Sequence, residues 1–189
     1  MNFENDIKIC VSVLRAGGII LYPTDTIWGI GCDATNNEAV TKIFKLKKRE
    51  EQKSMIILLS QTDDIKNYSK SPSAKIKKLL STTEKPLTII YPSAKNIAVN
   101  LISCNGTIAM RVVKDMFCEV LINTFGKPIV STSANISGEP SPKVFDEISY
   151  AIKSGADYIV KHHQKNKIFT NPSKIILWKT DNELIVIRE

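Results

Sequence analysis

The chain has 189 residues, of which 43% are hydrophobic and 24% charged, and its formal net charge is +7. At roughly 100–200 residues per domain, this length predicts a single domain spanning residues 1–189 with a core of its own. The composition excludes disordered, collagen-like and mini-protein classes.

The chain starts with MNFENDIK, which lacks the charged and apolar pattern of a secretory signal. Its apolar runs are shorter than the ~20 residues of a membrane span, so we expect a cytoplasmic protein with no membrane segment. The four cysteines are far apart and form no CxxC pair, which predicts reduced, buried thiols rather than disulfides or a zinc site.

Helices and strands are predicted to alternate along the chain. Asn5–Ala16 has a helical stripe of apolar residues and ends at Gly17-Gly18, a C-terminal cap. Thr35 and Glu38 have the spacing of a capping box and start a second helix, whose apolar face continues to Lys47. Further helices are predicted at 63–69, 73–80, 115–124 and 142–153.

Strands are predicted at 18–22, 55–59, 87–91, 107–112, 128–132, 158–160, 174–178 and 184–188, with a short apolar run at 27–30. The last two strands form a hairpin across Thr180-Asp181-Asn182. The predicted fold class is therefore α/β, a single-domain twisted mixed sheet with flanking helices.

Common catalytic motifs do not occur in this sequence. The two histidines, His162 and His163, are adjacent and read as surface loop residues. GxSxG, HExxH, GxxxxGK[ST] and GxGxxG are all absent, which argues against serine hydrolases, zinc proteases, P-loops and Rossmann turns. A bound nucleotide would need a different phosphate-binding device.

Of the 26 cationic residues, 22 are lysines, which either reflect a biased genome or indicate an anionic partner, nucleotide or nucleic acid. The four arginines are more informative, because their planar fork matches carboxylate and phosphate.

Three polar clusters follow predicted strands or helices. They are Tyr22–Thr26, then Lys47-Lys48-Arg49 with Lys53, and Ser131–Gly138. Each has a simple structural explanation, as a turn or as cations at a helix C-terminus. Each could instead supply donors to phosphate or ribose at the edge of a sheet.

The ordered set of motifs resembles the YrdC/Sua5 domain of the threonylcarbamoyl-AMP synthases. The matching stretches are GGIILYPTDTIWGIGCDATNNEAVTKIFKLKKR, KPLTIIY, TIAMRV, STSANISGEPSP, PSKIIL and the terminal IVIRE. The resemblance implies ATP-dependent synthesis of L-threonylcarbamoyl-AMP from L-threonine, bicarbonate and ATP, with release of pyrophosphate. This reaction is the first step of the t6A modification of tRNA, and the chain resembles the short bacterial type.

The resemblance also assigns residues to the two substrates. The ATP side comprises Lys47, Arg49, Lys53, Thr107, Ser133, Asn135, Ser141 and Arg188, with Lys47 and Arg49 as the catalytic pair. The L-threonine side comprises Thr26, Arg111, Ser131 and Ser173. Arg111 lies near the end of the predicted Thr107–Val112 strand, and two roles remain open for it there. It could contact substrate, or it could form an ion pair with Asp115.

The sequence departs from the family pattern at Trp28, at Thr83-Glu84-Lys85, at Val113 and at Leu58, which affects the expected shape of the amino-acid pocket. Mg²⁺ is expected to arrive with the ATP phosphates, with no metal site in the protein. The expected partners are ATP, L-threonine and bicarbonate, the transferase proteins that consume the product, and tRNA through a basic surface. Two alternatives are a YciO-like relative, which shares the fold and the K-x-R and S-x-N motifs but not necessarily this activity, and an RNA-binding module without chemistry.

Overall fold

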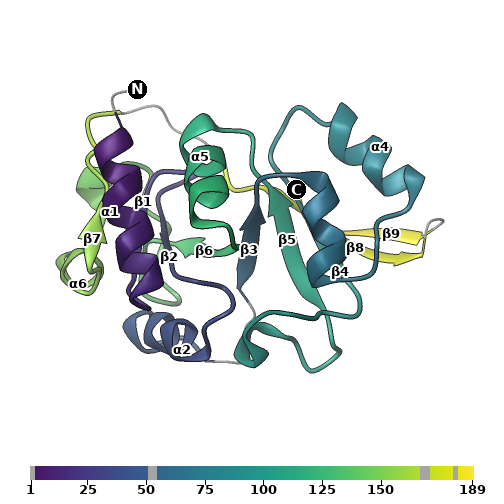
Figure 1. Cartoon of the computed structure of the whole chain (residues 1–189), viewed down its shortest axis with the longest axis horizontal. Helices are drawn as coiled ribbons and strands as arrows, with labels where there is room; N and C mark the ends of the chain where they lie inside the picture. The colour runs from purple at the N-terminus through teal and green to yellow at the C-terminus, as the bar shows by residue number, and fades with distance from the viewer. Residues whose placement is uncertain (1–2, 51–54, 167–170, 181–182) are drawn as a thin grey trace.

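A nine-stranded mixed sheet runs through the whole molecule in the order β7-β1-β2-β6-β3-β5-β4-β8-β9 (Figure 1). The computed structural model describes residues 3–50, 55–166, 171–180 and 183–189. The strands are β1 (Ile20–Tyr22), β2 (Gly29–Gly31), β3 (Ile56–Leu59), β4 (Leu87–Tyr91), β5 (Ile108–Val112), β6 (Ile129–Ser133), β7 (Tyr158–Ile159), β8 (Lys174–Thr180) and β9 (Glu183–Arg188).

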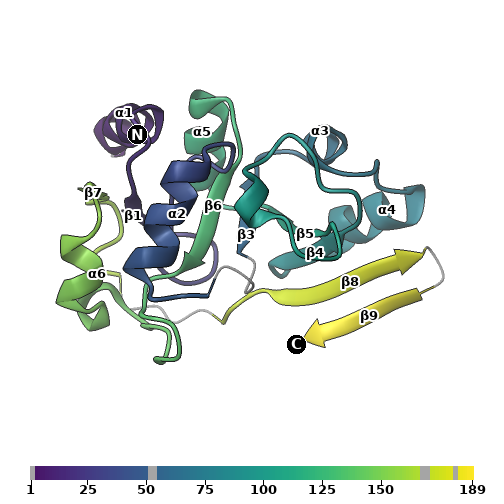
Figure 2. The same ribbon diagram turned by 90° about the horizontal axis from the view of Figure 1, so that it is seen from below.

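The sheet combines parallel and antiparallel pairs. β1 pairs with β7, β3 with β5, and β4 with β8 in parallel, and the other neighbours are antiparallel. The C-terminal hairpin of β8 and β9 extends along one side of the molecule (Figure 2). The predicted α/β fold with a mixed sheet is confirmed.

Alternate side chains along the strands enter two apolar clusters. Leu58 of β3 packs in the cluster that holds α1 (Glu4–Arg15) and α5 (Met116–Phe125), whereas its neighbours Ile57 and Leu59 belong to the larger cluster. That larger cluster includes side chains from the remaining α-helices. These helices are α2 (Asn37–Leu46), α3 (Ile65–Tyr68), α4 (Ala74–Thr82) and α6 (Tyr150–Ser154).

Three short 3₁₀ helices complete the fold: η1 (Thr62–Asp64), η2 (Val99–Leu101) and η3 (Phe145–Glu147). Helix α2 begins one residue later than the capping box predicted. Asn36, not Thr35, is its N-cap, and Asn36 Oδ1 accepts hydrogen bonds from the amides of Glu38 and Ala39 at 3.0 and 3.1 Å. The Thr35 hydroxyl instead donates to Asp33 Oδ1 at 2.6 Å, so it is committed to the preceding turn.

The single helix predicted at 142–153 was wrong. The chain forms η3 there, passes through an extended Ile148, and starts the short α6 with Ser149 as its N-cap. The buried side chain of Ile148 lies in the larger core cluster, which explains why the extended break is stable. Cys104 also differs from the prediction, because it is exposed while the other three cysteines are buried.

The predicted hairpin is confirmed, although residues 181–182 of its turn lie outside the described part of the chain. His162 and His163 lie in a turn after β7, with the imidazole of His162 stacked on Phe117. Among the helices of the described residues, none combines the length and apolar character that a bilayer crossing requires.

Candidate functional site

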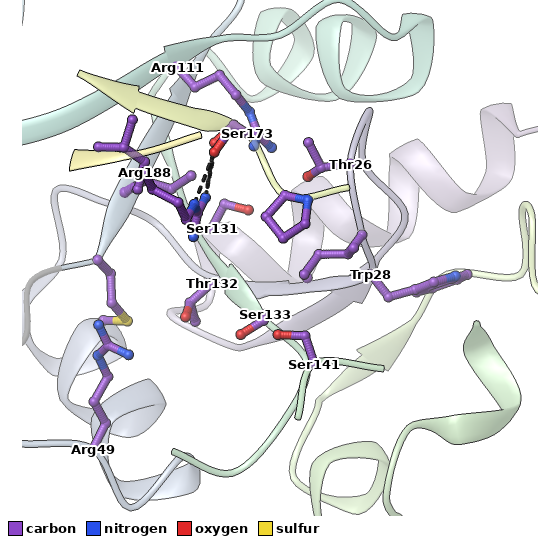
Figure 3. Close-up of a pocket in the computed structure, with 16 residues that line it drawn as sticks. Thr26, Trp28, Arg49, Arg111, Ser131, Thr132, Ser133, Ser141, Ser173 and Arg188 are labelled. Carbon is purple, nitrogen blue, oxygen red and sulfur yellow. Dashed lines mark hydrogen bonds between the residues drawn. The ribbon is translucent and has the colours of Figure 1, made fainter. Parts of the chain in front are cut away.

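A cavity of about 230 Å³ opens where β2, β6 and β3 meet the segment before β8. Eight of the twelve residues predicted to bind substrate line it: Thr26, Arg49, Arg111, Ser131, Ser133, Ser141, Ser173 and Arg188. They come from segments more than 150 residues apart in the chain. In the close-up, Arg111 and Ser173 lie at one end of the cavity and Arg49 at the other (Figure 3).

Of the other four predicted residues, Lys47 and Asn135 lie directly behind the cavity wall. The Nζ atom of Lys47 donates to the main-chain oxygens of Ser133 and Asn135, at 2.5 and 2.6 Å, and to Asn135 Oδ1 at 3.3 Å. An ammonium group has three protons, so these contacts use all of them. Only 1% of Lys47 is exposed, and it supports the loop after β6 from within.

The last two predicted residues are Thr107 and Lys53. Thr107 does not line the cavity, and its hydroxyl contacts Ser103 Oγ at 2.7 Å. Lys53 lies outside the described residues.

Burial shifts the pKa of both cations of the K-x-R motif. It lowers the pKa of Lys47 to about 8, with a further contribution from the nearby positive charge of Arg49. Burial also lowers the pKa of Arg49. The site therefore concentrates positive charge in a poorly hydrated region, which favours an anionic ligand.

The S-x-N loop is held by a chain of hydrogen bonds. Ser133 Oγ donates to Asn135 Oδ1, and Asn135 Nδ2 donates to the main-chain oxygen of Glu139, both at 2.5 Å. The amide of Ser137 donates to the main-chain oxygen of Lys47 at 2.8 Å, which ties the loop to the end of α2. The K-x-R and S-x-N motifs thus form one structural unit.

Arg188, from the last strand, is fixed by Ser173. Its Nε and Nη2 atoms donate to the main-chain oxygen of Ser173 at 3.1 and 2.7 Å (Figure 3). The Ser173 hydroxyl lies 2.7 Å from Thr88 Oγ1 of β4. Burial, followed by the charge of Arg111, lowers the pKa of Arg188.

Arg111 lies in β5 and forms a buried ion pair, but not with Asp115. Its Nη2 atom is 3.1 Å from Asp25 Oδ1, and the two side chains are only 3% and 8% exposed. The expected alternative partner, Asp115, instead caps α5 by accepting a hydrogen bond from the amide of Cys118 at 2.9 Å. Arg111 Nε is buried and has no hydrogen-bond partner among the described residues.

Asp25 and the pocket residues Thr132, Met55 and Pro172 were not predicted as site residues. Asp25 does lie in the first polar cluster, so the signal was present in the sequence. Burial raises the pKa of its carboxyl, and Arg111 opposes that rise.

The departures from the family pattern fall in different places. Trp28 lines the cavity and packs on Phe145, with ring centroids 4.9 Å apart. Thr83, Glu84 and Lys85 line a separate groove, which meets the cavity at Pro172 and Arg188. Leu58 and Val113 are buried in the cluster beneath α5, away from the cavity lining.

A family model for Sua5, YciO and YrdC proteins, described as "Telomere recombination", matches residues 12–189. The chain belongs to this Sua5/YciO/YrdC family. A threonylcarbamoyl-AMP synthase of Wigglesworthia glossinidia brevipalpis is 37% identical over 178 residues, which cover 93% of this chain and 90% of the relative. The family resemblance of the sequence motifs is therefore confirmed.

Two solved structures of family members have the same fold. P. abyssi Sua5 complexed with L-threonine matches with a TM-score of 0.86 and 24% identity, over 98% of this chain and 54% of that one. E. coli YciO matches with a TM-score of 0.84 and 24% identity, over 98% of this chain and 89% of that one. Fold alone thus groups this Sua5/YciO/YrdC chain equally with both.

Proposed function

We propose that this protein joins L-threonine, bicarbonate and ATP into L-threonylcarbamoyl-AMP and pyrophosphate, as its relatives' name indicates. The observation that supports the proposal is a cavity with an arginine side chain at each of its two ends. Arg111 has a buried donor without a partner among the described residues at one end, and Arg49 lies at the other. A carboxylate fits the first end and a polyphosphate the second.

The amino-acid end would hold threonine through Arg111, Thr26, Ser131 and Ser173. The neutral threonine amine attacks the carbon of carbon dioxide and loses a proton, or attacks bicarbonate with loss of water, and forms a carbamate. The carbamate oxygen then attacks the α-phosphorus of ATP and displaces pyrophosphate. This reaction needs reactants held in line and neutralised charge more than a histidine base.

The nucleotide end would hold ATP through Arg49, Ser133 and Ser141, with Lys47 and Asn135 supporting them. Arg188 is bonded to Ser173 at the amino-acid end, so its contact with ATP remains a prediction, as do those of Lys53 and Thr107. Arginine donors and loop hydroxyls would stabilise charge that develops on the phosphates during displacement. No group of three or more His, Cys, Asp or Glu side chains among the described residues could bind a metal ion. We therefore propose that Mg²⁺ enters as part of the Mg·ATP substrate.

The test is pyrophosphate release by the purified protein with Mg·ATP, bicarbonate and L-threonine, each omitted in turn, with the adenylate product assayed in parallel. Release should require all three. Equal release without threonine or bicarbonate would instead indicate an ATPase.

The structural match to E. coli YciO keeps a second candidate open, a YciO-like relative that shares the fold but not necessarily this activity. The presence of Thr26 and Arg111 in one cavity supports the synthase. We also propose that the product passes to transferase proteins that modify tRNA. If tRNA itself binds through the basic surface, its affinity should fall steeply with salt, unlike the affinity for ATP.

A further inference from the structure

Thr24 and Asp25 do not line the cavity, but each contacts a residue that does. Asp25 pairs with Arg111, and Thr24 contacts Thr26. We propose that Thr24 and Asp25 are positioning residues that orient Thr26 and Arg111 toward the amine and the carboxylate of a free L-α-amino acid. This inference rests on the proposed function, because it concerns the same threonine site.

Asp25 fixes the orientation of the Arg111 guanidinium. The contact between Arg111 Nη2 and Asp25 Oδ1 measures 3.1 Å and is almost fully shielded from water. The contact is an ion pair rather than a hydrogen bond, because neither Asp25 oxygen has a hydrogen-bond partner among the described residues. A guanidinium has five N–H donors in a rigid plane, so a carboxylate held beside one edge restricts where the other donors point. Because Arg111 Nε is buried without a partner, a carboxylate ligand would relieve an unfavourable state that the protein alone leaves in place.

Thr24 determines the direction of the Thr26 hydroxyl proton. The Thr24 hydroxyl has one proton, which it donates to the main-chain oxygen of Ile27 at 2.8 Å. In the 2.9 Å contact between the two hydroxyls, Thr24 must therefore accept and Thr26 must donate. The amide of Thr26 also donates to Thr24 Oγ1 at 3.0 Å, which holds the turn in this arrangement.

The Thr26 oxygen is consequently left with lone pairs and no proton for a ligand. It lies in the wall of the same cavity as Arg111 (Figure 3). A cationic or neutral amine supplies N–H donors to such an oxygen, and a carboxylate accepts from the Arg111 fork. An α-keto acid, whose keto oxygen only accepts hydrogen bonds, satisfies only one of the two requirements.

The experiment compares two variants with two matched controls. Asp25→Asn removes the charge that anchors Arg111, and Thr24→Val removes the hydroxyl that takes the Thr26 proton. Asp33→Asn is the control for the first, because Asp33 is 7% exposed and pairs with Lys127 at 2.9 Å outside the cavity. Thr35→Val is the control for the second, because its hydroxyl bonds only within the Asp33 turn and to Lys127.

The measurements are the Kd of L-threonine by calorimetry, the KM values for threonine and ATP, and kcat at saturation. Each positioning variant should raise the threonine Kd and KM about 10-fold, with kcat and the ATP KM within about twofold of wild type. Both controls should lower the melting temperature without changing the threonine Kd. Thr24→Ser keeps the hydroxyl and should retain wild-type affinity.

Two different failures are distinguishable. A wild-type protein that neither binds threonine nor releases pyrophosphate with it overturns the proposed function. An active wild type whose Thr24→Val and Asp25→Asn variants behave like their controls overturns the inference alone. If Asp25→Asn does not fold, Asp25→Glu replaces it, because the longer side chain keeps the charge but displaces the oxygen from Arg111, and an unchanged threonine Kd is again the contradicting result.

Discussion

The ammonium group of Lys47 donates to both the main-chain oxygen and the side-chain oxygen of Asn135, 88 residues further along the chain. With its third proton on the main-chain oxygen of Ser133, Lys47 has no donor left for a ligand. The lysine of the K-x-R motif therefore shapes the S-x-N loop and adds charge behind it, while Arg49 reaches the cavity itself.

Lys47→Met should reduce both stability and ATP affinity. The substitution leaves buried oxygen atoms without their donor, at a cost of about 1–3 kcal/mol in the free energy of unfolding. We expect the S-x-N loop to lose its fixed position, and this loss, together with the missing positive charge, should weaken ATP binding about 10- to 150-fold. Urea unfolding and calorimetry with ATP measure the two effects.

Arg49→Ala is the matched comparison for this prediction. Arg49 lines the cavity and is only partly buried, so its loss should weaken ATP binding and lower the free energy of unfolding less than Lys47→Met does. If Lys47→Met melted earlier but bound ATP normally, Lys47 would be a structural residue without influence on the site.

The amino-acid sequence predicted much of this unit because local patterns determine it. The helical period from Val40 through Ile43 predicted that Lys47 points into the protein, and its 1% exposure confirms the direction. The strands flanking the polar clusters were also predicted closely, since continuous apolar runs mark strands buried on both faces.

Contacts between distant segments could not be predicted in this way. Asp115 was the nearest acidic residue to Arg111 in sequence, yet the ion pair forms with Asp25 from the loop between β1 and β2. The choice depends on strand order, which places β1 and β5 on opposite sides of β3 and which no local pattern encodes. The prediction of the N-cap of α2 failed for a different reason. Asn36 and Thr35 are both good N-cap residues, and only the turn at Asp33, which binds the Thr35 hydroxyl, decides between them.

Gly31→Ala should destabilise the sheet strongly. A Cβ atom at Gly31 would lie 2.2 Å from the main-chain oxygen of Val130 and 2.9 Å from the ring of Tyr22. The backbone of the paired strand β6 cannot shift without breaking hydrogen bonds of the sheet, so we expect a loss of at least about 1–3 kcal/mol in the free energy of unfolding. Thermal and urea unfolding measure this loss. Gly106→Ala is the control, because Gly106 has a positive φ of 68° but open space where a Cβ atom would lie. It therefore shows the cost of backbone strain without a packing clash. Equal losses in both variants would contradict the packing argument.

Arg111→Lys should raise the threonine KM and leave the ATP KM unchanged. Lysine keeps the charge beside Asp25 but lacks the planar fork, so it cannot hold Asp25 and a substrate carboxylate at once. We expect an increase of about 10-fold or more in the threonine KM. A threonine KM equal to that of wild type, with only a lower melting temperature, would limit Arg111 to the ion pair.

The free energy of unfolding should depend on pH through the protonation of Lys47. Burial lowers the pKa of this group in the folded protein to about 8, against an ordinary value of 10.5. Between these values the unfolded chain binds a proton that the folded protein does not, so this contribution to stability rises with pH and is lost as pH falls through about 8. The buried thiols of Cys10, Cys32 and Cys118, whose pKa values burial raises, act in the opposite direction.

The informative quantity is therefore the difference in unfolding free energy between wild type and Lys47→Met from pH 7 to 10.5. It should increase by up to about 3 kcal/mol, at 1.36 kcal/mol per pKa unit. A difference that stays flat with pH would mean that Lys47 keeps an ordinary pKa despite its burial.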